Sequence, residues 1–248
     1  MNNRQPKSSA ATARPRLAVL VILFTGTPGS LFAAEAPSVA AARLPIPPIW
    51  WLAPSGALLA LGTAAFLYRW MKLQAEGDAM QIKIAACVRA GARTYLNQQY
   101  RVVALVFAAV FALLLLLSFG FQAQSPIAPF AFLTGGFISG LTGFLGMKTA
   151  TYASNRTAAA AARSLNAGLQ VAFRSGAVMG LSVVGFGLLT ICLWFYGLYN
   201  LTNLSIHALT VALLAFSFGA SLQALFARVG GGIYTKAADV GADLVGKV

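Results

Sequence analysis

Charged residues are scarce in this 248-residue chain, in which Lys, Arg, Asp and Glu together make up 9% and hydrophobic residues 58%. Soluble domains carry about a quarter charged residues. This composition excludes an ordinary soluble domain. It predicts an all-α fold, a polytopic bundle of transmembrane helices.

Histidine and cysteine are also rare, which excludes several kinds of catalytic and metal site. His207 is the only histidine, so no Ser/His/Asp set can form; we expect it at the membrane interface. Cys87 and Cys192 lack the spacing of zinc ligands, and we predict two small packing residues without a disulfide. The glycines at 230–232 lack the Lys-Ser/Thr spacing of a nucleotide-binding phosphate loop.

Acidic residues are few as well, and the formal net charge is +13. Such a charge invites a nucleic-acid partner, which we reject because the basic residues follow membrane topology rather than forming a soluble basic face. At the N-terminus, a basic start, a short apolar core and small residues predict a secretory signal peptide over 1–36. A Pro/Ala-rich linker, 37–48, precedes the transmembrane domain, 49–248.

Five apolar segments are long enough to cross a membrane, which takes about 20 residues. The predicted spans are 49–70, 102–121, 128–147, 176–198 and 206–228. A helix over 78–100 is expected before the second span. Its buried face should contain Ile84, Val88, Tyr95 and Leu96. In the third span, Gly136, Gly140 and Gly143 predict a small-residue face for close helix packing.

The basic residues orient these spans. All 13 Lys and Arg residues downstream of Arg43 fall in 69–101, 148–174 and 228–247, which five spans place on one side of the membrane. Positive residues mark the cytoplasmic side. We therefore expect a multi-pass protein of the cell inner membrane, with a periplasmic N-terminus and the residue-248 end in the cytoplasm.

Charge returns abruptly after residues 175–227, which contain no Asp, Glu, Lys or Arg. In a helix, Lys236, Asp239, Asp243 and Lys247 would fall within an arc of about 80°. Carboxylates bind Mg²⁺, which bridges phosphate oxygens, and lysines bind phosphate as point charges. This stripe predicts a metal–phosphate site. The alternative is an interfacial helix whose charges merely neutralise one another.

The C-terminal residues resemble the membrane-integral inorganic pyrophosphatases, the pyrophosphate-energised proton or sodium pumps. Their pattern of Asp, seven residues, Lys, any residue and Glu is matched by Asp239, Lys247 and Val248, with the Glu expected one residue further on. The preceding Phe-Ala-Arg-Val-Gly-Gly-Gly-Ile-Tyr-Thr-Lys, ending at Lys236, is also similar. The resemblance covers roughly residues 49–248.

The resemblance implies a homodimeric pump of about sixteen transmembrane helices per subunit, of which this chain would be the first five. Such a pump hydrolyses magnesium pyrophosphate on the cytoplasmic side and moves H⁺ or Na⁺ outward. Lys236 and Lys247 would bind phosphate, Asp239 and Asp243 would hold Mg²⁺, and Arg228 would belong to the ion gate. K⁺ is a further candidate cofactor.

The family's water-activating residues lie on later helices, so the catalytic residues are not identified in this chain. We therefore expect an N-terminal part of a pump that is inactive by itself. Two other functions stay open on the residues alone. One is a non-enzymatic membrane bundle whose stripe binds a phosphate-bearing regulator. The other is half of a secondary transporter, although no internal repeat supports it.

Overall fold

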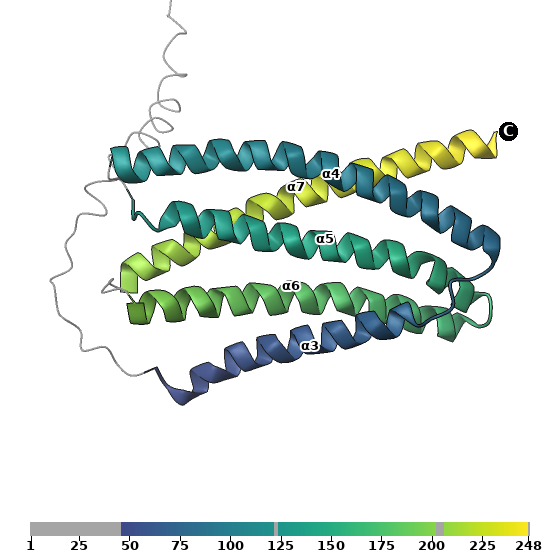
Figure 1. Ribbon diagram of the computed structural model, residues 1–248, viewed down its shortest axis with the longest axis horizontal. Helices are drawn as coiled ribbons and strands as arrows, with labels where there is room; N and C mark the ends of the chain where they lie inside the picture. Colours follow the sequence, from purple (N-terminus) through teal and green to yellow (C-terminus); the bar gives the residue numbers. More distant parts are fainter. Residues whose placement is uncertain (1–45, 122–123, 202–205, 248) are drawn as a thin grey trace, which may run out of the picture. The chain divides into compact units, whose positions relative to one another are not determined.

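The computed structural model describes residues 46–121, 124–201 and 206–247. The predicted signal peptide over 1–36, most of the linker and the side chain of His207 lie outside this part. Each regular element within it is helical: η1 Pro48–Trp51, α3 Leu52–Lys72, α4 Ala79–Leu115, η2 Leu116–Gly120, α5 Ala128–Ala161, α6 Leu165–Leu201 and α7 Ile206–Gly246 (Figure 1). The prediction of an all-α bundle is confirmed.

Five of the helical segments are long and apolar enough to cross a membrane. With a rise of 1.5 Å per residue, the 37 residues of α4 and the 41 of α7 span about 55 and 60 Å. The hydrocarbon core of a bilayer is about 30 Å thick. Both helices are therefore much longer than one crossing requires.

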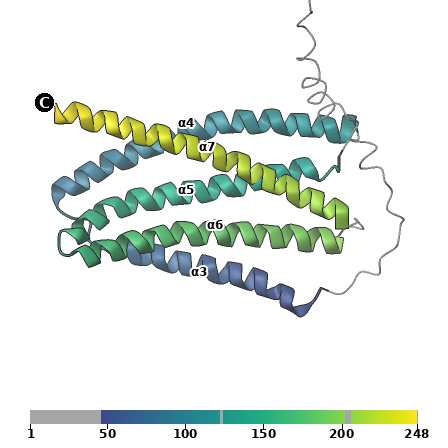
Figure 2. The ribbon, with the colours of Figure 1, turned by 180° about the vertical axis from the view of Figure 1, so that it is seen from behind.

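The helices α3 to α7 alternate in direction, so the α3–α4 loop, the α5–α6 turn and the end of α7 lie at one end of the bundle (Figures 1 and 2). This end is called the basic end below, because the residues 69–101, 148–174 and 228–247 that carry the Lys and Arg side chains extend from it along the helices. The clustering predicted from the charge pattern is thus present in the folded chain.

Helix α4 begins where the sequence predicted but does not stop at residue 100. Asp78 caps it, since its Oδ1 accepts from the Gln81 amide at 2.7 Å while the Gln81 side chain accepts from the Asp78 amide at 3.3 Å. The expected separate helix over 78–100 and the span from 102 are one helix, because no capping or breaking residue interrupts them at Arg101.

The buried face of α4 differs from the prediction. Ile84 and Val88 are 54% and 39% exposed, so their assignment to the core is wrong. Leu96 is buried as predicted, and Tyr95 is half-buried. The observed buried positions are Ala85, Ala92, Leu96, Val103 and Phe107. Small alanines at the contact let the helices approach closely, which a search for large apolar residues overlooks.

Helix α5 packs against α4, α6 and α7, and α3 packs against α6. The tightest contact is between α5 and α7: a Cβ added at Gly135 or Gly219 would lie 2.0 Å from a backbone oxygen of the other helix. A Cβ at Gly136 would lie 1.9 Å from the Phe107 ring. The predicted small-residue face is correct at Gly136, whereas Gly140 and Gly143 have looser surroundings.

Aromatic rings lie at both ends of α3. Near its start, the Trp50 ring stacks on Tyr196 of α6 with centroids 5.8 Å apart. Near its end, the Arg174 guanidinium lies 4.0 Å from the centre of the Trp70 ring. These contacts join α3 to α6 at both ends.

The two cysteines are free. Cys192 is buried, as expected of a packing residue, but Cys87 is exposed. The packing prediction is therefore wrong for Cys87, because it lies on a face of α4 that no described helix covers.

Candidate functional site

The site predicted from the sequence lies on α7, which continues through the three glycines at 230–232. Each glycine in a helix interior costs about 1 kcal/mol relative to alanine, so other contacts must hold this segment. Gln99 of α4 donates to the Phe226 carbonyl at 3.0 Å, and the Tyr234 hydroxyl donates to the Val88 carbonyl at 3.3 Å. A Cβ at Gly230 would lie 1.9 Å from the Tyr95 hydroxyl, so this glycine permits the close approach of α4.

The continuous helix brings the predicted charged residues onto one stripe. Lys236, Asp239 and Asp243 lie within α7, and Lys247 follows its last residue, Gly246. At about 100° per residue, the four positions share an arc of about 80°. Asp239 and Asp243 are one turn apart, which places their Cβ atoms about 5–6 Å from each other.

The stripe is open to its surroundings. All four side chains are exposed, and Lys236 and Asp239 form an ion pair of 3.7 Å while 81% and 66% exposed. Among the residues that the structure describes, no group of three or more His, Cys, Asp or Glu could hold a metal ion. The stripe therefore forms at most one wall of a binding site.

The chemistry of the stripe nevertheless suits a magnesium–phosphate ligand. Mg²⁺ is usually bound through one or two carboxylates, several waters and the phosphates of its substrate, and Asp239 and Asp243 supply two carboxylates a turn apart. Lys236 and Lys247 place positive charge at both ends of this pair. The donor set thus fits one face of a hydrated Mg²⁺ with bound phosphate.

Arg228 lies on the same helix, eight residues before Lys236 and about 12 Å away along the axis. Its side chain is exposed, and it forms no ion pair with any residue in the described part of the chain.

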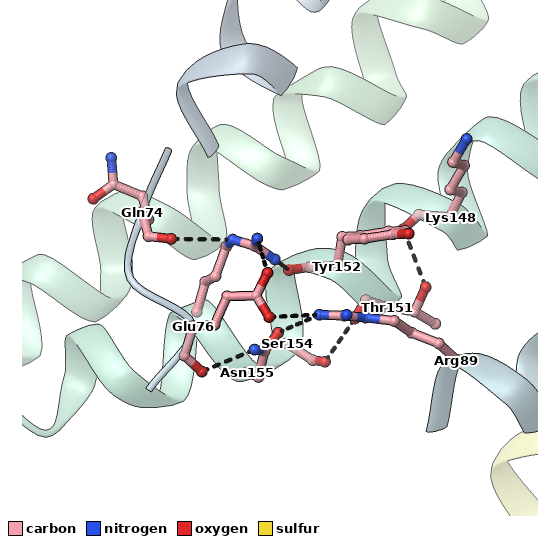
Figure 3. Close-up of polar contacts among 9 residues, drawn as sticks. Gln74, Glu76, Arg89, Lys148, Thr151, Tyr152, Ser154 and Asn155 are labelled. Carbon is pink, nitrogen blue, oxygen red and sulfur yellow. Dashed lines mark hydrogen bonds and ion pairs between the residues drawn. The ribbon is translucent and has the colours of Figure 1, made fainter. Parts of the chain in front are cut away.

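A second polar group at the basic end was missed by the sequence analysis. It is centred on Glu76, in the loop between α3 and α4, and is called the Glu76 cluster (Figure 3). The Glu76 carboxylate pairs with Arg156 of α5, whose side chain is only 4% exposed. Arg156 also donates to the carbonyls of Gln74 at 3.2 Å and Tyr152 at 2.7 Å. These bonds satisfy a guanidinium that is almost fully buried.

Two further residues complete the Glu76 cluster. Asn155 of α5 donates to the Glu76 carbonyl at 2.9 Å and accepts from Arg89 of α4 at 3.2 Å. Arg89 also lies 3.6 Å from the Glu76 carboxylate and 4.4 Å from the centre of the Tyr152 ring. The cluster therefore ties the α3–α4 loop and α4 to α5. Its signal in the sequence is faint: Glu76 is one of only five acidic residues.

Comparison with known proteins identifies relatives of this chain. Residues 58–248 match the family described as "Inorganic H+ pyrophosphatase". A protein of Bacteroides thetaiotaomicron named "Putative K(+)-stimulated pyrophosphate-energized sodium pump" is 56% identical over 211 residues, covering 81% of this chain and 28% of that protein.

Two further relatives carry proton-pump names. "K(+)-insensitive pyrophosphate-energized proton pump 2" of Moorella thermoacetica is 45% identical over 195 residues, covering 79% of this chain and 28% of that protein. "K(+)-insensitive pyrophosphate-energized proton pump" of Caldanaerobacter subterraneus subsp. tengcongensis is 40% identical over 204 residues, covering 77% of this chain and 28% of that protein.

This chain spans about 28% of the length of these three relatives. The family match covers more than half of the chain and includes all four residues of the α7 stripe, Arg228 and the Glu76 cluster. The chain belongs to the inorganic H⁺ pyrophosphatase family.

Proposed function

We propose that this chain forms one wall of the substrate site of a pump that couples hydrolysis of magnesium pyrophosphate to outward movement of H⁺ or Na⁺. The observation that carries the proposal is the stripe of two carboxylates and two ammonium groups on one face of α7. Further helices outside these 248 residues complete the site, and the assembled pump is a homodimer.

Within that site, Asp239 and Asp243 hold Mg²⁺, while Lys236 and Lys247 bind phosphate oxygens. Bound Mg²⁺ neutralises charge that develops on the phosphates during hydrolysis. The lysines add fixed positive charge where the leaving phosphate gains negative charge.

Arg228 lies on the ion path about two turns below the stripe. An arginine within a membrane is costly unless it is paired, and no described residue pairs with it. An acidic side chain from another part of the pump therefore faces it. The ion is H⁺ or Na⁺, and K⁺ is a candidate cofactor, because the names of the relatives differ in both respects.

A graft tests the proposed roles. The hydrolysis rate of the Bacteroides relative is measured first. The segment of the relative that aligns with this chain is then replaced by this chain's residues. We expect the graft to release phosphate from magnesium pyrophosphate. Asp239→Asn or Asp243→Asn should lower the rate roughly 100-fold or more, as losing one electrostatic contact to a transition state does in other enzymes.

Lys83→Gln is the matched control for this graft, because Lys83 is exposed on α4 and lies outside the stripe. It should hydrolyse at the rate of the unmodified graft. The 248-residue polypeptide by itself should show no turnover. Full activity of both Asp variants would refute the metal-binding roles.

The proposed orientation places the basic end in the cytoplasm of a cell whose inner membrane holds the pump. Cys87 is exposed near that end, and Cys192 is buried. A membrane-impermeant maleimide should therefore label Cys87 only after the inner membrane is permeabilised. Mass spectrometry of the protein detects the label as an increase in mass. Cys87→Ser should abolish the labelling. If Cys87 is labelled in intact spheroplasts, the proposed orientation is wrong and the basic end faces the periplasm.

A further inference from the structure

A cavity of about 500 Å³ lies between α4 and α5 near the basic end. Its lining includes three cationic side chains, Arg89, Arg93 and Lys148, and no Asp or Glu. Phe144 and Met147 give it an apolar side. The stripe on α7 contributes no residue to this lining.

The positive charge around this cavity is only partly balanced. Glu76 interacts with Arg89 at 3.6 Å, but it is shared with the buried Arg156. Arg93 and Lys148 form no ion pair with any residue in the described ranges. Two guanidinium groups share one carboxylate, and two further cations have none, so the cavity favours an anion.

One donor of the Arg89 side chain has no partner. The Nε atom of Arg89 is buried and makes no hydrogen bond within the described part of the chain, although the same guanidinium bonds to Asn155 and faces the Tyr152 ring (Figure 3). Buried donors are nearly always paired in proteins. Because this atom is covered, an anion in the cavity would instead approach the accessible part of the Arg89 side chain, which is 23% exposed.

The order of residues along α5 indicates what kind of anion fits. Phe144 precedes Lys148 by about one turn and lies toward the apolar middle of the helix, while Lys148 and Thr151 lie toward the basic end. A ligand with an anionic head and an apolar tail would match this sequence of surfaces. Basic pockets between transmembrane helices on the cytoplasmic side commonly bind phospholipid head groups.

We propose that this cavity binds the phosphate of an anionic phospholipid, with Arg93, Lys148 and Arg89 around the head group and Phe144 and Met147 beside an acyl chain. The site would hold a structural lipid of the leaflet that faces the basic end. Its chemical requirement is a phosphate-containing head group of net negative charge, joined to a hydrocarbon chain.

Native mass spectrometry of the purified protein in mild detergent tests the proposal without any measurement of hydrolysis. Phosphatidylglycerol, phosphatidylcholine and inorganic phosphate are added in turn. We expect phosphatidylglycerol to be retained in preference to phosphatidylcholine. The double variant Arg93→Gln/Lys148→Gln should lower its affinity roughly tenfold or more, since each cation near an anionic lipid contributes substantially.

The double variant Lys83→Gln/Arg163→Gln is the matched control, because it removes two exposed cations outside the cavity lining. It should retain the lipid as the unmodified protein does. Arg93→Lys/Lys148→Arg keeps both charges and should restore binding, which separates lost charge from misfolding. Equal losses in both Gln variants, equal retention of phosphatidylcholine, or complete displacement of the lipid by millimolar phosphate would overturn the lipid assignment.

Discussion

Two charged groups at the basic end have opposite surroundings. In the Glu76 cluster, the Arg156 side chain is 4% exposed and bonded to residues from the α3–α4 loop and α5. In the α7 stripe, Lys236 and Asp239 are 81% and 66% exposed and interact across one turn of a single helix. In the first group the buried Arg156 finds its partners within this chain, whereas the second group presents exposed charge outward. The contrast distinguishes a group that stabilises the fold from one that is free to contact a ligand.

The energetics of the two groups differ for the same reason. Exposed ion pairs are screened by water and contribute about 0–1 kcal/mol. A buried charge depends on its partner, and removing one member of a buried pair costs roughly 3–5 kcal/mol because the other stays buried and unpaired. The Glu76 cluster should therefore control folding stability, while the stripe should have little influence on it.

The largest effect on stability is expected from Glu76→Gln. This change leaves the Arg156 guanidinium buried without its counter-charge, although its bonds to two carbonyls remain. Glu76 is itself 34% exposed, so we expect a loss near the lower end of the range, about 3 kcal/mol. Unfolding of the purified protein by denaturant, followed by circular dichroism, measures it.

Asp239→Asn is the comparison for Glu76→Gln, because it removes a carboxylate from the other group. Substitutions at exposed positions usually change stability by less than about 0.5 kcal/mol. Equal losses of stability in the two variants would show that the proposed division between the groups is wrong.

Two glycines on α7 extend the comparison to packing, with smaller effects. Gly219→Ala would place a Cβ 2.0 Å from the Phe132 backbone oxygen, and such overpacking costs about 1–3 kcal/mol. Gly241 lies in the stripe segment with nothing within 4 Å of an added Cβ. Gly241→Ala should instead stabilise the helix by up to about 1 kcal/mol. The same denaturant titration measures both changes in the free energy of unfolding. A loss of stability in Gly241→Ala would indicate that another part of the protein packs against Gly241.

The sequence predicted the features that depend on local pattern. Apolar runs gave the five spans, and the charge-free stretch before Arg228 marked the stripe, whose helical phase follows from the spacing of Lys236, Asp239 and Asp243. The Glu76 cluster was missed because its partners, Glu76 and Arg156, lie 80 residues apart, and no local periodicity records such a pairing.

The interior of the bundle was harder to predict than its spans. Large apolar residues such as Ile84 were assigned to the core of α4, but the helix packs through Ala85 and Ala92. Likewise, glycines at 140 and 143 share the spacing of Gly136, yet only Gly136 is in tight contact. Spacing identifies a possible contact face, but the partner helix decides which positions are used.

The proposal that the α7 stripe holds Mg²⁺ and pyrophosphate is tested most directly by calorimetric titration of the grafted pump, at fixed Mg²⁺, with a pyrophosphate analogue that is not hydrolysed. We expect Mg²⁺-dependent binding of the analogue that weakens roughly tenfold or more in Asp239→Asn/Asp243→Asn, because the carboxylate ligands determine metal affinity, and that is unchanged in Lys83→Gln. Undiminished, Mg²⁺-dependent binding of the analogue by the double Asp variant would contradict the proposal.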